Sequence, residues 1–217
     1  GEMLDFLAEC LRYGISICVA GATSSGKTTL AGWLLTTIPD GKRIFTIENG
    51  SRELALVREK DGKVTNSVIH TLTRYSENEK QNIDQDMLLD MALRFNPEII
   101  CVGEMRSSEA YTAQESARTG HTVLTTIHSN SCESTYSRMR TLCKRKYDMD
   151  DEVLMDLVTE AFPIVVFTKQ LENRKRKLME IIECEITADG KRKFNPLYRY
   201  EITENRMEGD RFIINGT

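Results

Sequence analysis

The feature that most constrains this chain is a glycine-rich segment near its start. The segment, Gly21-Ala22-Thr23-Ser24-Ser25-Gly26-Lys27-Thr28, matches the pattern G-x-x-x-x-G-K-[ST] at every fixed position. A chain of this length and average composition would match by chance on the order of once in a hundred. The apolar run Ile15 to Ala20 precedes the segment, and a helix-like run follows it. The sequence therefore predicts a strand, a phosphate-binding loop and a helix in succession.

The fixed residues of this loop each have a chemical role in holding phosphate. Gly21 and Gly26 let the backbone curl so that its N–H groups point inward at phosphate oxygens. The helix that starts near Lys27 adds the positive end of its dipole. Lys27 reaches the β- and γ-phosphates as a point charge, and the Thr28 hydroxyl is suited to ligate Mg²⁺. The residues predicted to bind nucleotide are Gly21, Ala22, Thr23, Ser24, Ser25, Gly26, Lys27, Thr28 and Thr29.

Strand-like and helix-like segments alternate through most of the chain, and strands alone follow. Strands are expected at 15–20, 43–48, 98–104 and 121–128. Helices are expected at 2–13, from the loop to Pro39, at 82–95, at 107–119 and after a capping box at Asn130-x-x-Glu133. The polar stretch 49–82 has no firm assignment beyond short strands and a loop. Three strands in a β-meander are expected at 163–171, 177–187 and 193–203.

This pattern predicts an α/β fold with a mostly parallel sheet and helices on both of its faces. Residues 1–162 are expected to form the core, and residues 163–217 a small strand-rich extension of the same domain.

Two of the predicted strands end in a carboxylate. Four apolar residues, Ile99 to Val102, lead to Glu104 at the carboxyl end of a strand, where open α/β sheets bind ligands. Glu104 is suited there to orient an attacking water or a water on Mg²⁺. The strand 43–48 ends in Glu48, and a second carboxylate at this edge would suit water activation or metal positioning. A solvated strand-end glutamate is the alternative for each.

Histidines flank the strand at 121–128, and an arginine follows Glu104. Because side chains alternate along a strand, the odd separation of His121 and His128 places them on opposite faces, so they are not expected to share a metal. His128 is placed to approach a γ-phosphate, with a structural histidine as the alternative. Arg106 is suited to contact phosphate, a neighbouring subunit or a surface carboxylate.

Charge and cysteine usage exclude several classes of protein. Lys and Arg number 29 against 33 Asp and Glu, and a net charge of −4 argues against a bulk nucleic-acid binder. The basic runs 144–146 and 174–177 are expected to be solvated, with a DNA or acidic-lipid contact as the alternative. The six cysteines form no C-x-x-C pair, and Cys18 and Cys101 are expected to be reduced core residues. No apolar run approaches the ~18 residues of a membrane span, so a cytoplasmic location is expected.

Four segments, in this order, resemble the secretion ATPase superfamily of type II and type IV secretion, type IV pili and conjugation. That family has a Walker A loop, an acidic box, a Walker B segment ending in Gly-Glu, and a His box. The matching stretches here are GATSSGKTT, RIFTIEN, PEIICVGEMR and TGHTVLTTIHSNS. The resemblance covers essentially the whole chain, and its later part is similar to the Flp/Tad pilus-assembly and conjugal-transfer branch.

The resemblance implies a RecA-like P-loop NTPase core that hydrolyses ATP with Mg²⁺ in a homo-oligomer, expected to be a hexamer. It implies a motor that powers translocation or pilus assembly, held at the bacterial inner membrane by membrane components of a secretion, pilus or conjugation machine. No sequence-specific nucleic-acid binding is expected. The family carries a separate N-terminal domain, so this chain is expected to be the C-terminal motor domain of a longer protein.

Carried over residue by residue, the resemblance assigns most of the site. Lys27 and Thr28 match the nucleotide-binding pair, and Glu48 and Glu104 match the acidic-box and Walker B glutamates. The implied catalytic residues are Glu104, Glu48, Lys27 and His128, the implied metal ligands are Thr28 and Glu104, and the further residues are His121, of the His box, and Arg106. Two residues depart from the family: Asn49 stands where it usually has Asp, and Ser24 where it often has Gly.

Two other functions use the same loop. A DNA-translocating RecA-like motor would show DNA-stimulated ATPase activity and a steep salt dependence, and the acidic balance of the chain argues against it. A nucleotide-binding assembly module would bind ATP to set subunit geometry without turning it over.

Overall fold

The structure, a computed structural model, describes all residues of the chain, 1–217. The helices are α1 (Glu2–Arg12), α2 (Lys27–Thr36), α3 (Gln85–Arg94), α4 (Glu109–Arg118), α5 (Cys132–Cys143) and α6 (Asp151–Ala161), with a 3₁₀ turn η1 (Glu79–Gln81). The strands are β1 (Ile17–Gly21), β2 (Arg43–Glu48), β3 (Glu59–Lys60), β4 (Lys63–Val64), β5 (Ser67–Leu72), β6 (Ile99–Met105), β7 (Thr122–Ile127), β8 (Ile164–Gln170), β9 (Arg176–Ile186), β10 (Arg192–Arg199), β11 (Ile202–Glu208) and β12 (Arg211–Gly216).

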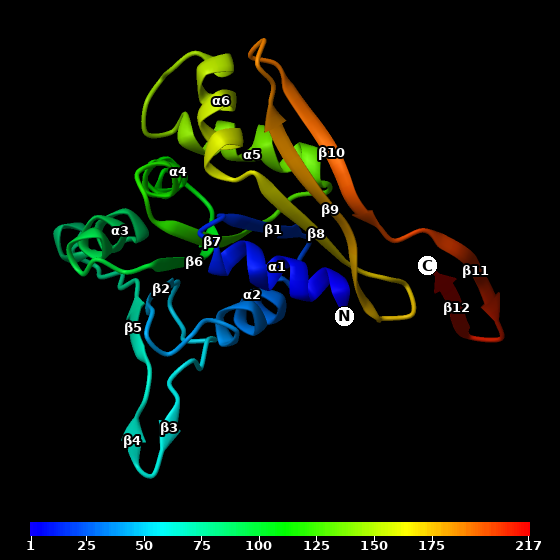
Figure 1. Ribbon diagram of the computed structural model, residues 1–217, viewed down its shortest axis with the longest axis horizontal. Helices are drawn as coiled ribbons and strands as arrows, with labels where there is room; N and C mark the ends of the chain where they lie inside the picture. The colour runs from blue at the N-terminus through cyan, green and yellow to red at the C-terminus, as the bar shows by residue number, and fades with distance from the viewer.

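An eight-stranded sheet in the order β10-β9-β8-β1-β7-β6-β2-β5 runs through the molecule (Figure 1). The strands from β8 to β5 are all parallel, whereas β9 and β10 continue the sheet antiparallel. The predicted α/β fold with a mostly parallel sheet and later antiparallel strands is thereby confirmed. Since β1 lies between β8 and β7, the loop that follows it leaves the sheet near its middle.

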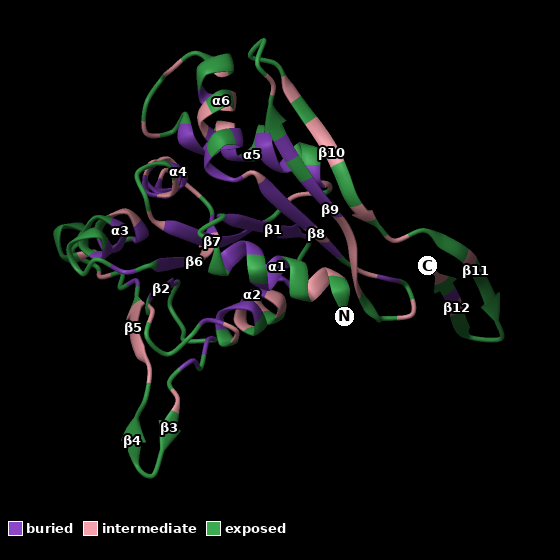
Figure 2. Ribbon diagram, in the orientation of Figure 1, coloured by how far each residue is buried: buried purple, intermediate pink, exposed green.

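Helices cover both faces of this sheet (Figure 1). One core lies under α3, α4, α5 and α6, and the other lies under α1 and α2. Alternate residues of one strand supply the two cores: in β1, Cys18 faces the first core and Val19 the second. Burial on both faces explains why this strand is apolar at every position rather than at alternate ones, and Figure 2 shows the central strands buried along their length.

Four expectations about individual elements were wrong in detail. The first strand begins at Ile17 rather than Ile15, because the Ser16 hydroxyl there accepts a hydrogen bond from the Val123 N–H instead. The third helix begins at Gln85 rather than Asn82, because the Asp84 carboxylate caps it by accepting from the Met87 N–H. The last predicted strand, at 193–203, is also too long, since the corresponding strand β10 ends at Arg199.

The capping box of α5 is the fourth difference. Ser131, rather than Asn130, is the cap: its hydroxyl accepts from the Ser134 N–H, and the Ser134 hydroxyl accepts from the Ser131 N–H. The extended backbone of Ser131, with φ −161° and ψ 168°, gives its side chain this reach.

Several elements lie outside the predicted set. Helix α6 was not anticipated, and β5 lies in the polar stretch without assignment. Two hairpins, β3–β4 and β11–β12, project from the body of the protein (Figure 1). All six cysteines are buried and unpaired, as expected for Cys18 and Cys101. None of the helices combines the length and the apolar character that crossing a membrane requires.

Candidate active site

The glycine-rich loop joins the end of β1 to the start of α2. A Cβ on Gly21 would lie 2.4 Å from both the Ser25 hydroxyl oxygen and the Thr168 carbonyl oxygen, so only glycine fits. Gly26, with φ +98°, is the N-cap of α2 in the left-handed region that favours glycine. The curled loop therefore presents backbone N–H groups beside the N-terminus of a helix, which is the geometry that binds phosphate.

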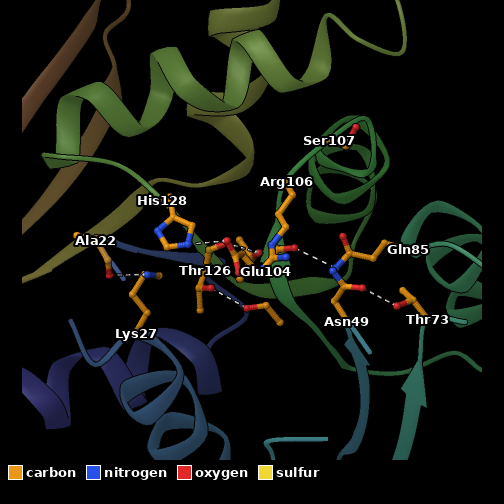
Figure 3. Close-up of polar contacts among 12 residues, drawn as sticks. Ala22, Lys27, Asn49, Thr73, Gln85, Glu104, Arg106, Ser107, Thr126 and His128 are labelled. Carbon is orange, nitrogen blue, oxygen red and sulfur yellow. Dashed lines mark hydrogen bonds and ion pairs between the residues drawn. The ribbon is translucent and has the colours of Figure 1, made fainter. Parts of the chain in front are cut away.

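Lys27 is buried at the base of this loop. Its Nζ donates to the carbonyl oxygen of Gly21 at 2.9 Å. It also donates to the carbonyl oxygen of Ala22 at 2.8 Å (Figure 3). Burial lowers the pKa of Lys27 below its ordinary value; the negative charge of Glu104 opposes this shift and the positive charge of Arg106 adds to it.

Glu104 lies near the end of β6 with two cationic or polar neighbours. Arg106 Nη2 donates to Glu104 Oε2 at 2.5 Å, and this bond raises the pKa of Arg106. His128 Nε2, from the segment after β7, lies 2.9 Å from Glu104 Oε1 (Figure 3). The contact between His128 and Glu104 is an ion-pair distance without hydrogen-bond geometry. Glu104 Oε1 is therefore buried without a hydrogen-bond donor. The structure thus brings Glu104, Arg106 and His128 together.

The backbone around Glu104 is held by two side chains that the sequence reasoning did not single out. Thr126 Oγ1, in β7, donates to the Gly103 carbonyl oxygen at 2.7 Å. Gln85 Nε2, at the start of α3, donates to the Glu104 carbonyl oxygen at 2.9 Å. Thr126 is detectable as a hydroxyl near the end of a buried strand, whereas Gln85 carries no signal that separates it from other helical polar residues.

Glu48 lies at the end of β2 and is buried. Its Oε1 accepts from the backbone N–H groups of Glu53, at 2.7 Å, and Leu54, at 3.0 Å. Its Oε2 is buried without any hydrogen-bond donor. One oxygen of this carboxylate therefore holds the segment that follows the strand, and the other is free.

His70, in β5, is a neighbour of Glu48 to which the sequence reasoning attached no role. Its Nδ1 lies 2.8 Å from Thr46 Oγ1 and 3.8 Å from Glu48 Oε2. Burial lowers the pKa of His70, the nearby Arg52 charge lowers it further, and Glu48 opposes the shift. Parallel pairing of β2 and β5, which places Thr46 opposite His70, creates this contact.

A cavity of about 80 Å³ lies between the start of α2 and the two carboxylates. Its lining includes Thr28, Glu48, Asn49, Glu104, Arg106 and Thr126. A volume of this size holds several waters. The Asn49 side chain is turned toward Thr73, whose hydroxyl donates to Asn49 Oδ1 at 2.7 Å (Figure 3).

The residues at this cavity suit a magnesium ion. Mg²⁺ prefers oxygen ligands, usually one or two carboxylates together with waters and phosphate oxygens. The cavity is lined by Thr28 and by two glutamates, and each of these carboxylates has one buried oxygen without a hydrogen-bond donor. An unpartnered buried carboxylate oxygen calls for a cation or an ordered water.

Thr29, also predicted to bind nucleotide, is exposed on α2 and does not line this cavity. His121 is a second predicted residue that the structure does not bring to this group. It precedes β7, whereas His128 follows the same strand, so the two histidines lie at opposite ends. His121 Nδ1 lies 3.0 Å from the Pro97 carbonyl oxygen, at the end of the sheet where β6 and β7 begin. This position leaves His121 with a local structural contact.

A loop of this sequence and curl, between a central parallel strand and a helix, defines the chain as a P-loop protein of the α/β class. The family model described as "Type II/IV secretion system protein" matches residues 2–203. The chain therefore belongs to the type II/IV secretion system protein family.

Individual relatives agree with this assignment. The chain is 27% identical over 199 residues to VirB11 of Agrobacterium tumefaciens, covering 89% of this chain and 54% of that protein. It is 31% identical over 187 residues to the type IV secretion system protein PtlH of Bordetella pertussis, covering 83% and 53%. The chain thus spans about half the length of these relatives.

A solved structure shows the same fold. It is the VirB11 ATPase of the Brucella suis type IV secretion system in complex with sulphate, with a TM-score of 0.69 and 28% identity. The match covers 84% of this chain and 54% of that one.

Proposed function

We propose that this chain is the motor domain of a secretion-type ATPase that hydrolyses ATP with Mg²⁺. The observation that carries the proposal is the position of Glu104, which lines one small cavity together with Glu48 and with Thr28, the last residue of the glycine-rich segment. Membership of a family whose relatives include a VirB11 ATPase supports the same activity.

The phosphate loop supplies the binding step. The backbone N–H groups of residues 22–26 and the N-terminus of α2 would receive the phosphate oxygens. Lys27 now donates to two carbonyl oxygens of its own loop, and a nucleotide would offer it phosphate oxygens in their place. Phosphate oxygens carry more negative charge than carbonyl oxygens, so this exchange of acceptors strengthens the hydrogen bonds of the ammonium and favours binding.

Glu104 would orient the attacking water. Its carboxylate lines the cavity, and the buried oxygen Oε1 has no donor, so it is able to accept a hydrogen bond from that water. Arg106 holds the other oxygen and sets the direction of the carboxylate. His128 touches Glu104 and also lines a groove with Ala22 and Thr23, so it would link the carboxylate to the phosphate loop.

Thr28 and Glu48 are the residues that would hold Mg²⁺ directly, and Glu104 would act through a water. When bound, the ion would neutralise charge on the β- and γ-phosphates. Glu48 would contribute its free oxygen Oε2, since its other oxygen already binds two backbone N–H groups.

We further propose that the complete protein works as a homo-oligomer, a hexamer, on the cytoplasmic side of a membrane-embedded machine. VirB11 and PtlH carry the names of type IV secretion system proteins, which supports this setting. ATP and Mg²⁺ are the proposed ligands, and no sequence-specific nucleic-acid contact is proposed.

Steady-state phosphate release from ATP and Mg²⁺, measured across protein concentrations, tests the proposal. Wild-type activity is expected to rise more than linearly with concentration, because subunits complete one another's sites. Lys27→Ala is expected to abolish it, since the buried ammonium is lost. Tight ATP binding without turnover, in this chain and in the full-length protein, would instead support an assembly module, and stimulation by DNA would support a DNA motor.

A further inference from the structure

The phosphate loop contains a residue in a conformation that its side chain disfavours. Ser24 has φ +63°, in the left-handed region. A residue with a Cβ is destabilised there because the Cβ approaches a carbonyl oxygen, and glycine is not. Serine at this position therefore needs support from elsewhere in the fold.

That support comes from β9, far along the chain. Arg176, the first residue of β9, donates from Nε to the Ser24 carbonyl oxygen at 2.9 Å. Its stem also lies along the loop, since a Cβ on Gly26 would be 3.3 Å from Arg176 Cδ. The sequence had predicted a solvated turn for this basic run.

Strand pairing explains how Arg176 reaches the loop. Thr168 of β8 pairs with Gly21 at the end of β1, and Arg176 pairs with Gln170 two residues further on. Arg176 therefore lies at the edge where the phosphate loop leaves the sheet. The neighbouring hydroxyl of Thr168 lies 3.1 Å from the Ser25 hydroxyl and contacts the same loop from β8.

The bond to Ser24 has a consequence for phosphate binding. In a trans peptide the N–H of one residue points opposite to the preceding carbonyl. Holding the Ser24 carbonyl oxygen outward, toward Arg176, turns the Ser25 N–H inward, where it now donates weakly to the Ala22 carbonyl oxygen at 3.3 Å. We propose that Arg176 is a positioning residue that holds the Ser24–Ser25 peptide in the orientation that binds nucleotide phosphate.

The inference rests on the proposed function, because it concerns how the same loop binds a nucleotide. It differs from a direct contact between Arg176 and phosphate, in which the charge alone would matter. The neighbouring Lys175 provides a matched control: it carries the same charge in the same turn, and its side chain makes no hydrogen bond or ion pair.

Binding of a fluorescent ADP analogue with Mg²⁺ to this chain tests the inference. Arg176→Ala is expected to weaken binding about tenfold, which corresponds to the loss of one hydrogen bond to a charged donor. Lys175→Ala is expected to change affinity less than twofold. Arg176→Lys keeps the charge but lacks Nε, so it is expected to bind as weakly as Arg176→Ala. Wild-type affinity in Arg176→Lys would overturn the inference in favour of a charge effect.

Rescue by glycine provides the second readout. If Arg176 acts by stabilising the left-handed Ser24, then Ser24→Gly combined with Arg176→Ala is expected to recover most of the lost affinity. No recovery in the double variant would overturn the inference. If the wild-type chain binds no nucleotide, both this inference and the proposed function are overturned. If Arg176→Ala binds nucleotide normally, only this inference is overturned.

Amide hydrogen exchange without nucleotide completes the experiment. Exchange at residues 22–26 is expected to become faster in Arg176→Ala and to stay unchanged in Lys175→Ala, while both variants keep their circular dichroism spectrum. Equal exchange in the two variants would overturn the positioning role, because it would show that the loop keeps its orientation without the bond to Ser24.

Discussion

Glu48 and Glu104 reach the same cavity but differ in what surrounds each carboxylate. One oxygen of Glu48 accepts hydrogen bonds from two backbone N–H groups, so this residue holds the segment after β2 as well as lining the cavity. Glu104 accepts no backbone N–H and is flanked by Arg106 and His128 instead. The surroundings therefore favour Glu104 as the residue that orients water and Glu48 as the one that positions it or a metal.

Glu104→Gln tests this division of roles. The amide keeps the size of the side chain but is a poor base, so kcat is expected to fall about a hundredfold or more. Nucleotide affinity is expected to stay within a few fold, since the phosphate loop is intact. Loss of turnover with retained ATP binding would support Glu104 as the residue that orients water. Unchanged phosphate release in Glu104→Gln would show that this residue has no role in hydrolysis.

His70 predicts a dependence of stability on pH. Its pKa is lowered in the folded protein, so below the ordinary histidine value of about 6.5 the unfolded chain binds the proton more readily. The free energy of unfolding is therefore expected to fall as the pH drops from 7.5 to 5.5. His70→Asn can keep a hydrogen bond to Thr46 without titrating. Urea unfolding at both pH values should show that the free energy of unfolding falls less in His70→Asn than in the wild-type chain. Equal falls in the two proteins would contradict the role of His70 in this pH dependence.

At the scale of single elements, caps and backbone hydrogen bonds decide where helices begin. Asp84 and Asp150 each accept from backbone N–H groups at the start of a helix, at Met87 for the first and at Glu152 and Val153 for the second. Such caps satisfy N–H groups that have no partner inside the helix. The starts of α3 and α6 therefore depend on one polar side chain each as well as on the apolar pattern that follows.

Helix α5 offers a direct comparison between the predicted cap and the observed one. Ser131→Ala removes the acceptor of the Ser134 N–H and is expected to destabilise the protein by about 1 kcal/mol. Asn130→Ala, which the sequence had favoured as the cap, is expected to cost less than about 0.5 kcal/mol. Thermal unfolding of both variants checks this, since 1 kcal/mol shifts Tm by about 2–4 °C at this size. A larger effect at Asn130 would favour the original assignment.

At the scale of the whole molecule, the last third of the chain divides into two parts. Strands β8, β9 and β10 extend the central sheet, and β8 pairs directly with β1 beside the phosphate loop. The hairpin β11–β12 forms a separate two-stranded sheet that projects from the body (Figure 1). Its side-chain hydrogen bonds and ion pairs, such as that between Arg206 and Glu204, lie within the hairpin.

Removal of this hairpin tests its independence. A chain that ends at Tyr200 loses β11 and β12 but keeps every strand of the central sheet. Removal of the hairpin is expected to change the free energy of unfolding by about 1 kcal/mol or less. The Tm is therefore expected to stay within about 3 °C of the wild-type value. Nucleotide affinity is expected to be unchanged. A fall of more than about 10 °C, with normal expression, would show that the hairpin is part of the core.

The sequence by itself determined the loop, the sheet type and the two carboxylates. These follow from local patterns: a fixed spacing of glycine, lysine and threonine, and buried strands that each end in a polar residue. Parallel strands bring their carboxyl ends to one edge of a sheet, so Glu48 and Glu104 could be placed near Lys27 without knowing the order of the strands.

Tertiary structure alone decided which side chains support this site. His70 faces Glu48 because β5 pairs with β2, and Arg176 reaches Ser24 across 152 positions of sequence because β9 follows β8 beside β1. His121 lies away from the site because it precedes β7, whereas His128 follows the same strand. Such contacts depend on the order and register of strands. A local pattern of apolar and polar residues does not encode that order, because many strand orders would bury the same residues equally well.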